Sequence, residues 1–425
     1  MNTTLALILA GGRGKRMGLL CDVRPKPALP FAGRFRVIDF SLSNCVHSQI
    51  GDIGVITDYQ RSYLAEYLVR WHTLNARSLN FRVLEPGNSS YLGTADAVYQ
   101  NLDYVRTRPA ETVLVLAGDH ISKMDYTAML AFHRRVRADV TVGVIPVPAD
   151  QAYRFGTVAL DDEGRIADFV EKSPKPLSNL ASMGIYLFDK EFLAARLAAD
   201  THDAESTHDF GYTLLPQMVK RDRVYAYRFN GYWQDIGTVQ AYYEANMELT
   251  RPQPAFSLSS NSPVLTDGVD LPPTRILKHA TIVNSLIGPG CLIKGRVENS
   301  VLSPGVCVEE RAVVRDSLVM ENTFIGFHAM VEKSVLDESL DIGSYCYIGF
   351  GNSAAGQPDI TVVGKGAVIP PHTAIGRNCK IRPCVRPADF AAIVVPYGAT
   401  VIQSAAEHSP PEEVVSHAHH GRHLS

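Results

Sequence analysis

The chain has 425 residues, of which 46% are hydrophobic and 20% are charged. Its 41 Lys and Arg against 44 Asp and Glu residues give a net charge of -3 at pH 7, which argues against a general binder of nucleic acid or membrane surfaces. Seven scattered cysteines without CxxC spacing argue against a disulfide framework or a zinc site, and no apolar run reaches the ~18 residues of a membrane span. We therefore expect a soluble, cytoplasmic protein of two or three domains.

Residues 1–250 alternate short apolar runs with helical patterns. The apolar runs are residues 5–10, 52–57, 112–117 and 139–145. The helical patterns between them are residues 64–75, 94–105 and 126–136. Short apolar runs suit strands buried on both faces, so the alternation predicts an α/β domain with a mostly parallel sheet covered by helices.

A Pro- and Ser-rich stretch at residues 251–263 predicts a linker over residues 251–275, and a different period follows over residues 276–404. The serines of this period recur at intervals of 15, 17 and 17 residues, at Ser285, Ser300, Ser317 and Ser334. Aliphatic residues then fall six apart at Val363, Ile369, Ile375 and Ile381. This period predicts a left-handed parallel β-helix of hexapeptide repeats, with the aliphatic residues inside and Gly or Asn at the corners. A β-sandwich with accidental spacing is the alternative.

The tail at residues 405–425 is polar and has no hydrophobic pattern. Its histidines are suited to adventitious metal binding, at His417, His419, His420 and His423. We expect a disordered terminus instead.

A glycine-rich turn, Gly11-Gly12-Arg13-Gly14-Lys15-Arg16, follows the first apolar run. Walker A needs Ser or Thr where Arg16 stands, and the dinucleotide fingerprint needs Gly where Met17 stands. The turn alone is equally consistent with an ordinary structural turn. As a phosphate loop it would let backbone amides approach the phosphates, with Arg16 and Lys26 supplying positive charge.

Further blocks in chain order make the pattern specific. They include LAGGRGKR at residues 9–16, RVIDFSLSNC at 36–45, GTADAV at 93–98, LAGDH at 116–120, FVEK at 169–172, HDFG at 208–211 and GYWQDIG at 231–237. With these blocks the chain resembles the bacterial ADP-glucose pyrophosphorylases (glucose-1-phosphate adenylyltransferases). The resemblance implies a Rossmann-like, GT-A-like nucleotidyltransferase domain before the β-helix. It also implies Mg²⁺-dependent transfer of AMP from ATP to α-D-glucose 1-phosphate, giving ADP-glucose and pyrophosphate for glycogen or α-glucan synthesis.

The resemblance also implies roles for single residues. The implied catalytic residues are Arg16, Lys26 and Asp119. The implied nucleotide-binding residues are Gly11, Gly12, Gly14, Gly93 and Thr94, with Thr94 as a helix N-cap. The implied glucose 1-phosphate residues are Tyr91, Gly156, Glu171, Lys172 and Ser182. Asp119 and Asp235 would hold Mg²⁺, which prefers hard oxygen ligands, and Asp119 follows an apolar strand at the usual ligand crevice of an α/β sheet.

The departures from the family concern regulation. Val23 stands where family members carry a lysine that contacts an activator, and their Gln-rich loop is absent. Arg24 and Arg36 are the remaining candidates for effector binding. We therefore expect weak activation, or activation by an unusual effector.

Two other functions stay open at this point. One is a sister enzyme with another base or sugar phosphate. The other is a non-catalytic regulatory subunit, against which the retained Arg16, Lys26 and Asp119 count. An acyltransferase role lacks a candidate base, since His279, His328 and His372 are expected to be isolated surface residues. The family implies a homotetramer, without nucleic-acid or membrane partners.

Overall fold

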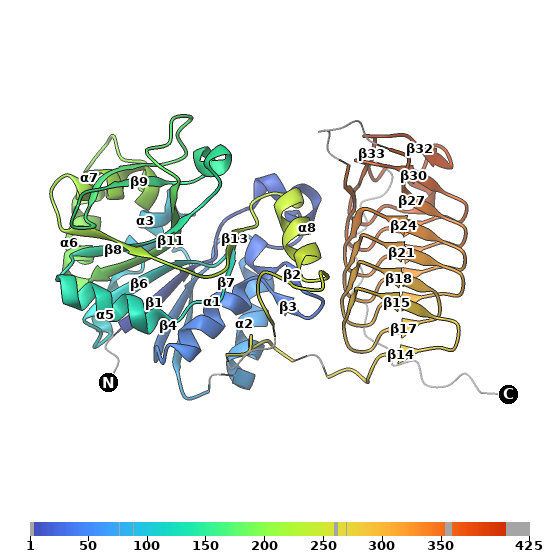
Figure 1. Ribbon diagram of the computed structural model, residues 1–425, viewed down its shortest axis with the longest axis horizontal. Coiled ribbons are helices and arrows are strands. Elements are labelled where there is room, and N and C mark those ends of the chain that lie inside the picture. Colours follow the sequence, from blue (N-terminus) through green and yellow to red (C-terminus); the bar gives the residue numbers. More distant parts are fainter. Residues whose placement is uncertain are drawn as a thin grey trace.

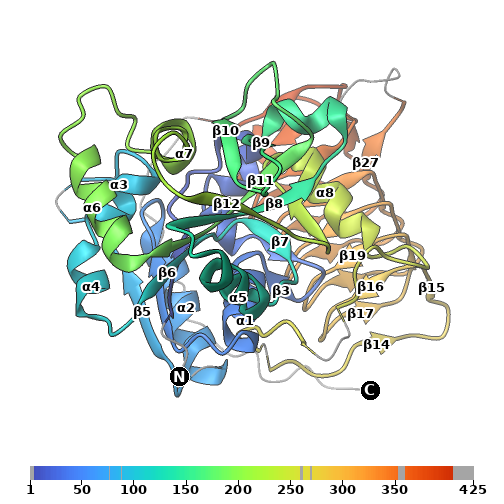
Figure 2. The ribbon, with the colours of Figure 1, turned by 60° about the vertical axis from the view of Figure 1, so that its left-hand side comes forward.

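The computed structural model describes residues 4–404 except residues 76, 88, 259–261, 269 and 353–358. The predicted tail, with its four histidines, lies outside the described residues. Figure 1 shows an α/β domain beside a stack of short strands, and Figure 2 shows the same two parts after a rotation. No helix in the described part of the chain is long and apolar enough to cross a membrane.

A nine-stranded sheet forms the centre of the α/β domain, in the order β10-β9-β11-β6-β1-β4-β5, with β8 beside β11 and β12 beside β8. The strands are β1 (Thr4–Leu9), β4 (Asp52–Ile56), β5 (Asn80–Leu84), β6 (Thr112–Ala117), β8 (Val140–Pro146), β9 (Thr157–Leu160), β10 (Ile166–Val170), β11 (Leu180–Asp189) and β12 (Val224–Arg228). β6, β1, β4 and β5 run parallel, whereas β11 is antiparallel to β6, β8 and β9. The four apolar runs predicted as strands are confirmed as β1, β4, β6 and β8.

Helices cover both faces of this sheet. They are α1 (Ile38–His47), α2 (Arg61–Asn75), α3 (Thr94–Tyr99), α4 (Leu102–Thr107), α5 (Tyr126–Val136), α6 (Lys190–Asp200) and α7 (Leu215–Val219). A further helix, α8 (Val239–Glu248), packs in the apolar cluster at the boundary with the β-helix. Leu5 and Leu7 of β1 pack towards α3, α4, α6 and α7, whereas the alternate residues Ala6 and Ile8 pack towards α1, α2 and α5.

The helix predicted at residues 94–105 is interrupted between α3 and α4. Asn101 precedes α4, and its side-chain amide donates to the Ala97 carbonyl at 2.9 Å and to the Tyr91 hydroxyl at 3.1 Å. Asparagine side chains compete with helical backbone bonding in this way, so the helical pattern continues in sequence while the helix itself restarts.

Three parallel sheets of short strands form the β-helix. The first face comprises β14 (Arg275–Ile276), β17 (Leu292–Ile293), β20 (Cys307–Val308), β23 (Phe324–Ile325), β26 (Asp341–Ile342) and β29 (Val368–Ile369). The second comprises β15 (Thr281–Val283), β18 (Arg296–Glu298), β21 (Val313–Arg315), β24 (Met330–Glu332), β27 (Tyr347–Phe350), β30 (Ala374–Gly376) and β32 (Val394–Val395). The third comprises β16 (Leu286–Ile287), β19 (Val301–Leu302), β22 (Leu318–Val319), β25 (Ser334–Leu336), β28 (Thr361–Val363), β31 (Lys380–Ile381) and β33 (Thr400–Val401). This is the left-handed β-helix of hexapeptide repeats that the period predicts.

The repeated serines form a ladder inside the β-helix. The amide of Ser300 donates to the hydroxyl of Ser285, that of Ser317 to Ser300, and that of Ser334 to Ser317, over 3.1–3.2 Å. Ser300, Ser317 and Ser334 are fully buried. The predicted aliphatic positions are also confirmed as interior, because Val363, Ile369, Ile375 and Ile381 are at most 1% exposed.

The corners of the β-helix hold more than Gly and Asn. Arg311, His328, Tyr345 and His372 all have positive φ. His328 and His372 stack on the Tyr345 ring, with centroids 5.3 and 5.2 Å away. The prediction that these histidines are surface residues is confirmed, but the expectation that they are isolated is wrong.

The third face of the β-helix packs on the α/β domain. Its outward-pointing Val301, Leu318, Val335 and Val362 are buried against a cluster that includes Met17 and residues of α8. Figure 1 shows α8 and the hairpin β2 (Pro30–Phe31) with β3 (Phe35–Arg36) turned towards the stack. A large apolar interface of this kind restrains relative motion of the two parts.

The stretch predicted as a linker lies against the α/β domain. Phe256 stacks on Tyr232 with ring centroids 4.3 Å apart, and the Leu265 amide donates to the Ser43 hydroxyl of α1 at 2.8 Å. Thr266 is buried as well. The stretch therefore connects the two parts and is itself fixed by packing.

Candidate active site

One cavity of about 710 Å³ opens near the carboxyl ends of β1 and β6. Its lining contains all the residues expected to act in catalysis and in nucleotide, sugar phosphate or metal binding: Gly11, Gly12, Gly14, Arg16, Lys26, Tyr91, Gly93, Thr94, Asp119, Gly156, Glu171, Lys172, Ser182 and Asp235. The crevice beyond the strand ends of an α/β sheet is where such folds bind ligands. The structure thus brings these residues together, and their individual roles stay predictions.

Two short strands join the distant carboxylates of the site. Asp119 follows β6 and precedes β7 (His120–Ser122), which pairs antiparallel with β13 (Trp233–Asp235). In this register His120 lies opposite Asp235. Because of this pairing, one ammonium group, Nζ of Lys26, lies 2.8 Å from Asp119 Oδ2 and 3.3 Å from Asp235 Oδ1.

The charged groups around Lys26 shift the pKa of Asp119 and of Lys26. Burial alone would raise the pKa of Asp119, but Lys26 and His120 lower it below its ordinary range. Burial alone would lower the pKa of Lys26, but Asp119 and Asp235 raise it. Lys26 and Asp119 are therefore both charged at neutral pH.

The donor set fits a hard divalent cation. The carboxylates of Asp119 and Asp235 converge on one positive group, and the Asp119 side chain is 36% exposed towards the cavity. The described part of the chain contains no cluster of three or more His, Cys, Asp or Glu that could hold a metal. A cation at these two carboxylates would therefore complete its shell with phosphate and water oxygens.

His120 is a site residue that the sequence analysis missed. Its Nδ1 lies 3.0 Å from the Met183 carbonyl, so Nδ1 carries the proton and donates. Its Nε2 then faces Asp119 at 3.5 Å and Asp235 at 3.9 Å, while Trp233 packs edge-on against the ring. The only signal in the sequence was its position directly after Asp119.

Glu171 is a further carboxylate in the lining of the cavity, and two glycines lie close against it. Glu171 and Lys172 follow β10, and Lys172 Nζ lies 2.9 Å from Glu171 Oε1. A Cβ on Gly156 would come within 2.4 Å of Glu171 Oε2, and one on Gly211 within 2.7 Å. Gly156 was expected to contact the sugar phosphate, but the structure shows that it also makes room for Glu171.

Lys172 itself has an unusual backbone. Its φ is +46°, in the left-handed region that costs a non-glycine residue conformational energy. Its ammonium group lies 5.6 Å from the centre of the Tyr212 ring. Burial alone would lower the pKa of Lys172, but Glu171 raises it. The Lys172 side chain is therefore positively charged at neutral pH.

The start of α3 is fixed by the HDFG block. The amides of Ala95 and Asp96 donate to the His208 carbonyl, and a Cβ on Gly93 would come within 2.3 Å of that oxygen. The expectation that Thr94 is the N-cap is wrong, because Gly93 holds that position. The Thr94 hydroxyl instead donates to Asp209 at 2.9 Å and accepts from the Phe210 amide.

Comparison with known proteins agrees with this geometry. A family model described as nucleotidyl transferase matches residues 5–252, and one described as GlmU-like, C-terminal hexapeptide matches residues 272–367. The chain belongs to the nucleotidyl transferase family. It is 45% identical over 419 residues to a protein of Thermomicrobium roseum named glucose-1-phosphate adenylyltransferase, covering 94% of this chain and 98% of that one. Proteins of the same name from Acetivibrio thermocellus (39% identity, 94% and 97% covered) and Thermotoga maritima (40%, 95% and 99%) are similar to it.

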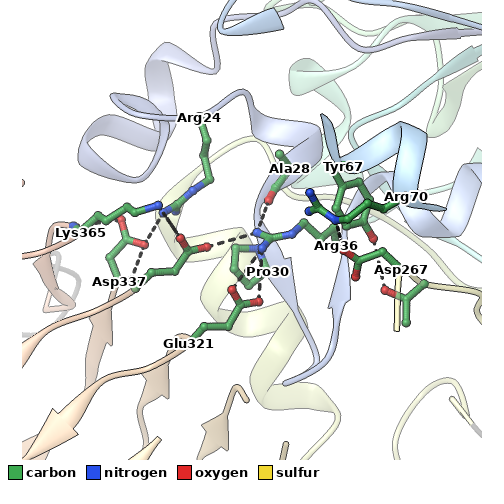
Figure 3. Close-up of polar contacts among 12 residues, drawn as sticks. Arg24, Ala28, Pro30, Arg36, Tyr67, Arg70, Asp267, Glu321, Asp337 and Lys365 are labelled. Carbon is green, nitrogen blue, oxygen red and sulfur yellow. Dashed lines mark hydrogen bonds and ion pairs between the residues drawn. The ribbon is translucent and has the colours of Figure 1, made fainter. Parts of the chain in front are cut away.

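Two basic residues of this nucleotidyl transferase lie away from the cavity. Arg24 and Arg36 do not line it. Their guanidinium groups lie at the boundary with the β-helix, where they contact Glu338 as well as Asp337 and Glu321, which Figure 3 labels. The resemblance to the family is thus confirmed, whereas effector binding by these two arginines stays a prediction.

Proposed function

We propose that this nucleotidyl transferase is a glucose-1-phosphate adenylyltransferase, which transfers AMP from ATP to α-D-glucose 1-phosphate and releases pyrophosphate. The observation that carries the proposal is that the glycine-rich turn, Arg16, Glu171 and Lys172 line one and the same cavity. Lys26, Asp119 and Asp235 lie in the lining of this cavity as well. The product, ADP-glucose, would serve glycogen or α-glucan synthesis, in line with the name shared by the similar proteins.

The reaction is an in-line displacement at phosphorus. A phosphate oxygen of glucose 1-phosphate forms a bond to the α-phosphorus of ATP, and the bond from that phosphorus to the bridging oxygen of pyrophosphate breaks. No covalent enzyme intermediate is needed, so the chain's task is positioning and charge neutralisation.

The residues of the cavity divide this task. The backbone of the glycine-rich turn and the exposed Arg16 bind the triphosphate. Lys172 holds the phosphate of the sugar phosphate, and Glu171 accepts hydrogen bonds from sugar hydroxyls. Lys26 neutralises charge where the two substrates meet.

Nucleotidyl transferases of this family use a divalent metal, and we propose Mg²⁺ here. Asp119 and Asp235 would hold it, because their oxygens are hard ligands that already converge on one positive charge. When bound, the ion neutralises negative charge on the phosphates.

A pyrophosphate-release assay tests the function. Purified protein is given ATP, UTP or other nucleoside triphosphates with glucose 1-phosphate or glucosamine 1-phosphate, with and without Mg²⁺. We expect the highest turnover with ATP, glucose 1-phosphate and Mg²⁺, and Asp119→Asn should lower kcat by orders of magnitude. Asp162→Asn, a matched change in an exposed turn, should leave kcat unchanged.

The other outcomes decide against the proposal. Preference for UTP or another sugar phosphate would indicate a sister enzyme, and no release with any pair would indicate a regulatory subunit. Weak or unusual activation, a homotetramer, a cytoplasmic location and domain boundaries at residues 250 and 275 stay predictions.

A further inference from the structure

One short segment, residues 24–28, is held at both ends by the same carboxylate of the β-helix. Glu338 Oε2 lies 3.2 Å from Arg24 Nη2, and its Oε1 lies 3.2 Å from Arg36 Nη1. The same Arg36 nitrogen donates to the Ala28 carbonyl at 2.8 Å. Glu338 therefore reaches the first residue of the segment directly and the last through Arg36. Figure 3 labels Arg24, Arg36 and Ala28 at this contact.

The segment carries Lys26 at its centre. Pro25 and Pro27 flank Lys26, and η2 (Lys26–Ala28) is a single 3₁₀ turn closed by a bond from the Leu29 amide to the Lys26 carbonyl. Proline fixes φ, so the segment bends little between its ends. We therefore expect a shift at Arg24 or Ala28 to displace Lys26, whose ammonium group lies between Asp119 and Asp235.

The charged residues at this boundary form one cluster, which comprises Arg24, Arg36, Glu321, Asp337, Glu338 and Lys365. Stabilising the fold does not by itself explain this cluster. Arg24 and Asp337 are 0% exposed, and removing such charges from water costs free energy that their attraction offsets only in part. Arg24 Nη2 binds Asp337 Oδ1 at 2.8 Å, but Nε and Nη1 of Arg24 have no hydrogen-bond partner among the described residues. The apolar third face of the β-helix already holds the two parts of the chain together. The cluster therefore contributes to the relative position of its residues more than to the strength of the contact.

The protonation states support a permanent ionic contact. Burial alone would raise the pKa of Glu338, but Arg24, Arg36 and Lys365 lower it to about 2. Lys365 Nζ lies 2.9 Å from Glu338 Oε2 and comes from the next coil. The carboxylate is therefore ionised throughout the pH range in which such an enzyme works.

We propose that Glu338 and Arg24 are positioning residues, through which the β-helix holds Lys26 in place between Asp119 and Asp235. The β-helix thus takes part in catalysis without contacting either substrate. The inference rests on the proposed function for its kinetic consequence, but its structural consequence, the fixed position of Lys26, is measurable without turnover.

Glu338→Gln is the main test, since it keeps the shape of the side chain and removes its charge. Tyr243→Phe is the matched control, because it removes another bond across the same boundary, from the Tyr243 hydroxyl to the Asp316 carbonyl at 2.7 Å, away from residues 24–28. We expect kcat of Glu338→Gln to fall about 10-fold while KM for glucose 1-phosphate changes little, as for a misplaced catalytic group. The control should keep the kcat of the unaltered protein.

A second measurement follows Lys26 directly and needs no activity. Acetylation of lysines by an N-hydroxysuccinimide ester is timed by peptide mass spectrometry on the substrate-free protein. Lys26 is buried, so it should react slowly in the unaltered protein and in Tyr243→Phe, and several-fold faster in Glu338→Gln. If Lys26 is labelled faster in Glu338→Gln but the unaltered protein releases no pyrophosphate, this inference is supported and the proposed function is rejected.

The opposite results overturn the inference. Unchanged Lys26 labelling in folded Glu338→Gln, or an equal loss of kcat in Tyr243→Phe, would show that the cluster is only structural. If Glu338→Gln fails to fold, the paired change Arg24→Met with Asp337→Leu replaces the buried ion pair with apolar side chains and cuts the link at the Arg24 end of the segment. It should show the same rise in Lys26 labelling, and unchanged labelling there would also overturn the inference.

Discussion

Lys26 is a residue whose position depends on three distant parts of the chain. Its ammonium group meets Asp119 after β6 and Asp235 at the end of β13. The segment around it is tied through Arg24 and Arg36 to Glu338 in the β-helix. At this scale, the position of one ammonium group depends on side chains that are at least 93 residues away in the sequence.

Gly156 offers a test of that fit. Gly156→Ala would place a Cβ within 2.4 Å of Glu171 Oε2 and 2.6 Å of the Phe169 ring, so the carboxylate and the ring must both move. We expect KM for glucose 1-phosphate to rise about 10-fold, since a lost hydrogen bond to a charged group is worth roughly 1.5–3 kcal/mol. Steady-state kinetics measure this.

Gly51→Ala is the control for this substitution, because a Cβ there meets no atom within 4 Å. It should leave KM unchanged. An unaltered KM in Gly156→Ala as well would show that Glu171 does not bind the sugar phosphate.

Asp39 gives a prediction for pH. This fully buried carboxylate accepts from the Arg36 amide at 2.8 Å and from the Tyr67 hydroxyl at 2.5 Å, yet burial raises its pKa to about 7. The folded protein then binds a proton more tightly than the unfolded chain. Its contribution to stability is therefore present at low pH and lost as pH rises from about 4 to about 7, by roughly 4 kcal/mol at most.

Chemical unfolding at a series of pH values checks this contribution. The difference in unfolding free energy between the unaltered protein and Asp39→Asn should fall between pH 4 and 7 and then level off. A difference that stays flat, or that rises, would mean that Asp39 is ionised in the folded protein throughout this range.

Among the elements, the serine ladder joins one coil of the β-helix to the next. Ser317 accepts from the Ser334 amide at 3.2 Å and donates to the Arg315 carbonyl at 2.7 Å. Ser317→Ala leaves the buried Ser334 amide without that acceptor, which costs about 1–3 kcal/mol. Thermal unfolding should show a lower Tm.

Ser285→Ala provides the comparison, since this rung is half-buried. Water can replace part of the lost bond there, so its Tm should fall less. Equal falls at the two positions would show that burial of the ladder does not matter for stability.

How much the sequence predicts also depends on the element. The strands β1, β4, β6 and β8 are apolar enough to be found directly, and the repeats of the β-helix reveal its coils. β7 and β13 have three residues each, too few for a hydrophobic period, and their pairing is what brings Asp119 and Asp235 together. The blocks of the family could therefore predict those aspartates, whereas His120 and the link from Glu338 depend on contacts that no local pattern contains.

At the scale of the whole molecule, one apolar cluster crosses the boundary between the two parts. It includes Met17 and Tyr242 from the α/β domain and Val301, Leu318 and Val335 from the β-helix. Separating the two parts would expose these side chains to water. We therefore expect the α/β domain and the β-helix to unfold together.

This coupling predicts one cooperative unfolding transition. The chain has two tryptophans, Trp71 in α2 and Trp233 in β13, so fluorescence reports only on the α/β domain. Far-UV circular dichroism also reports on the β-helix. The midpoints of the two signals in denaturant should coincide, and two separate midpoints would show that the parts unfold independently.

The stacking of coils in the β-helix limits where evolution can insert or delete residues. Between Ser334 and Thr361, which pair in the same face, the chain covers 27 residues by number, whereas the pairs Ser300–Ser317 and Ser317–Ser334 are each 17 apart. The stacking nevertheless continues, because the Cys379 amide binds the Thr361 hydroxyl as the serines do. A single residue gained within a strand would turn every later inward side chain towards water, while ten gained between β27 and β28 leave the next coil in register. Insertions and deletions should thus survive selection only at corners or in whole coils, so related chains should differ in length between their strands and not within them.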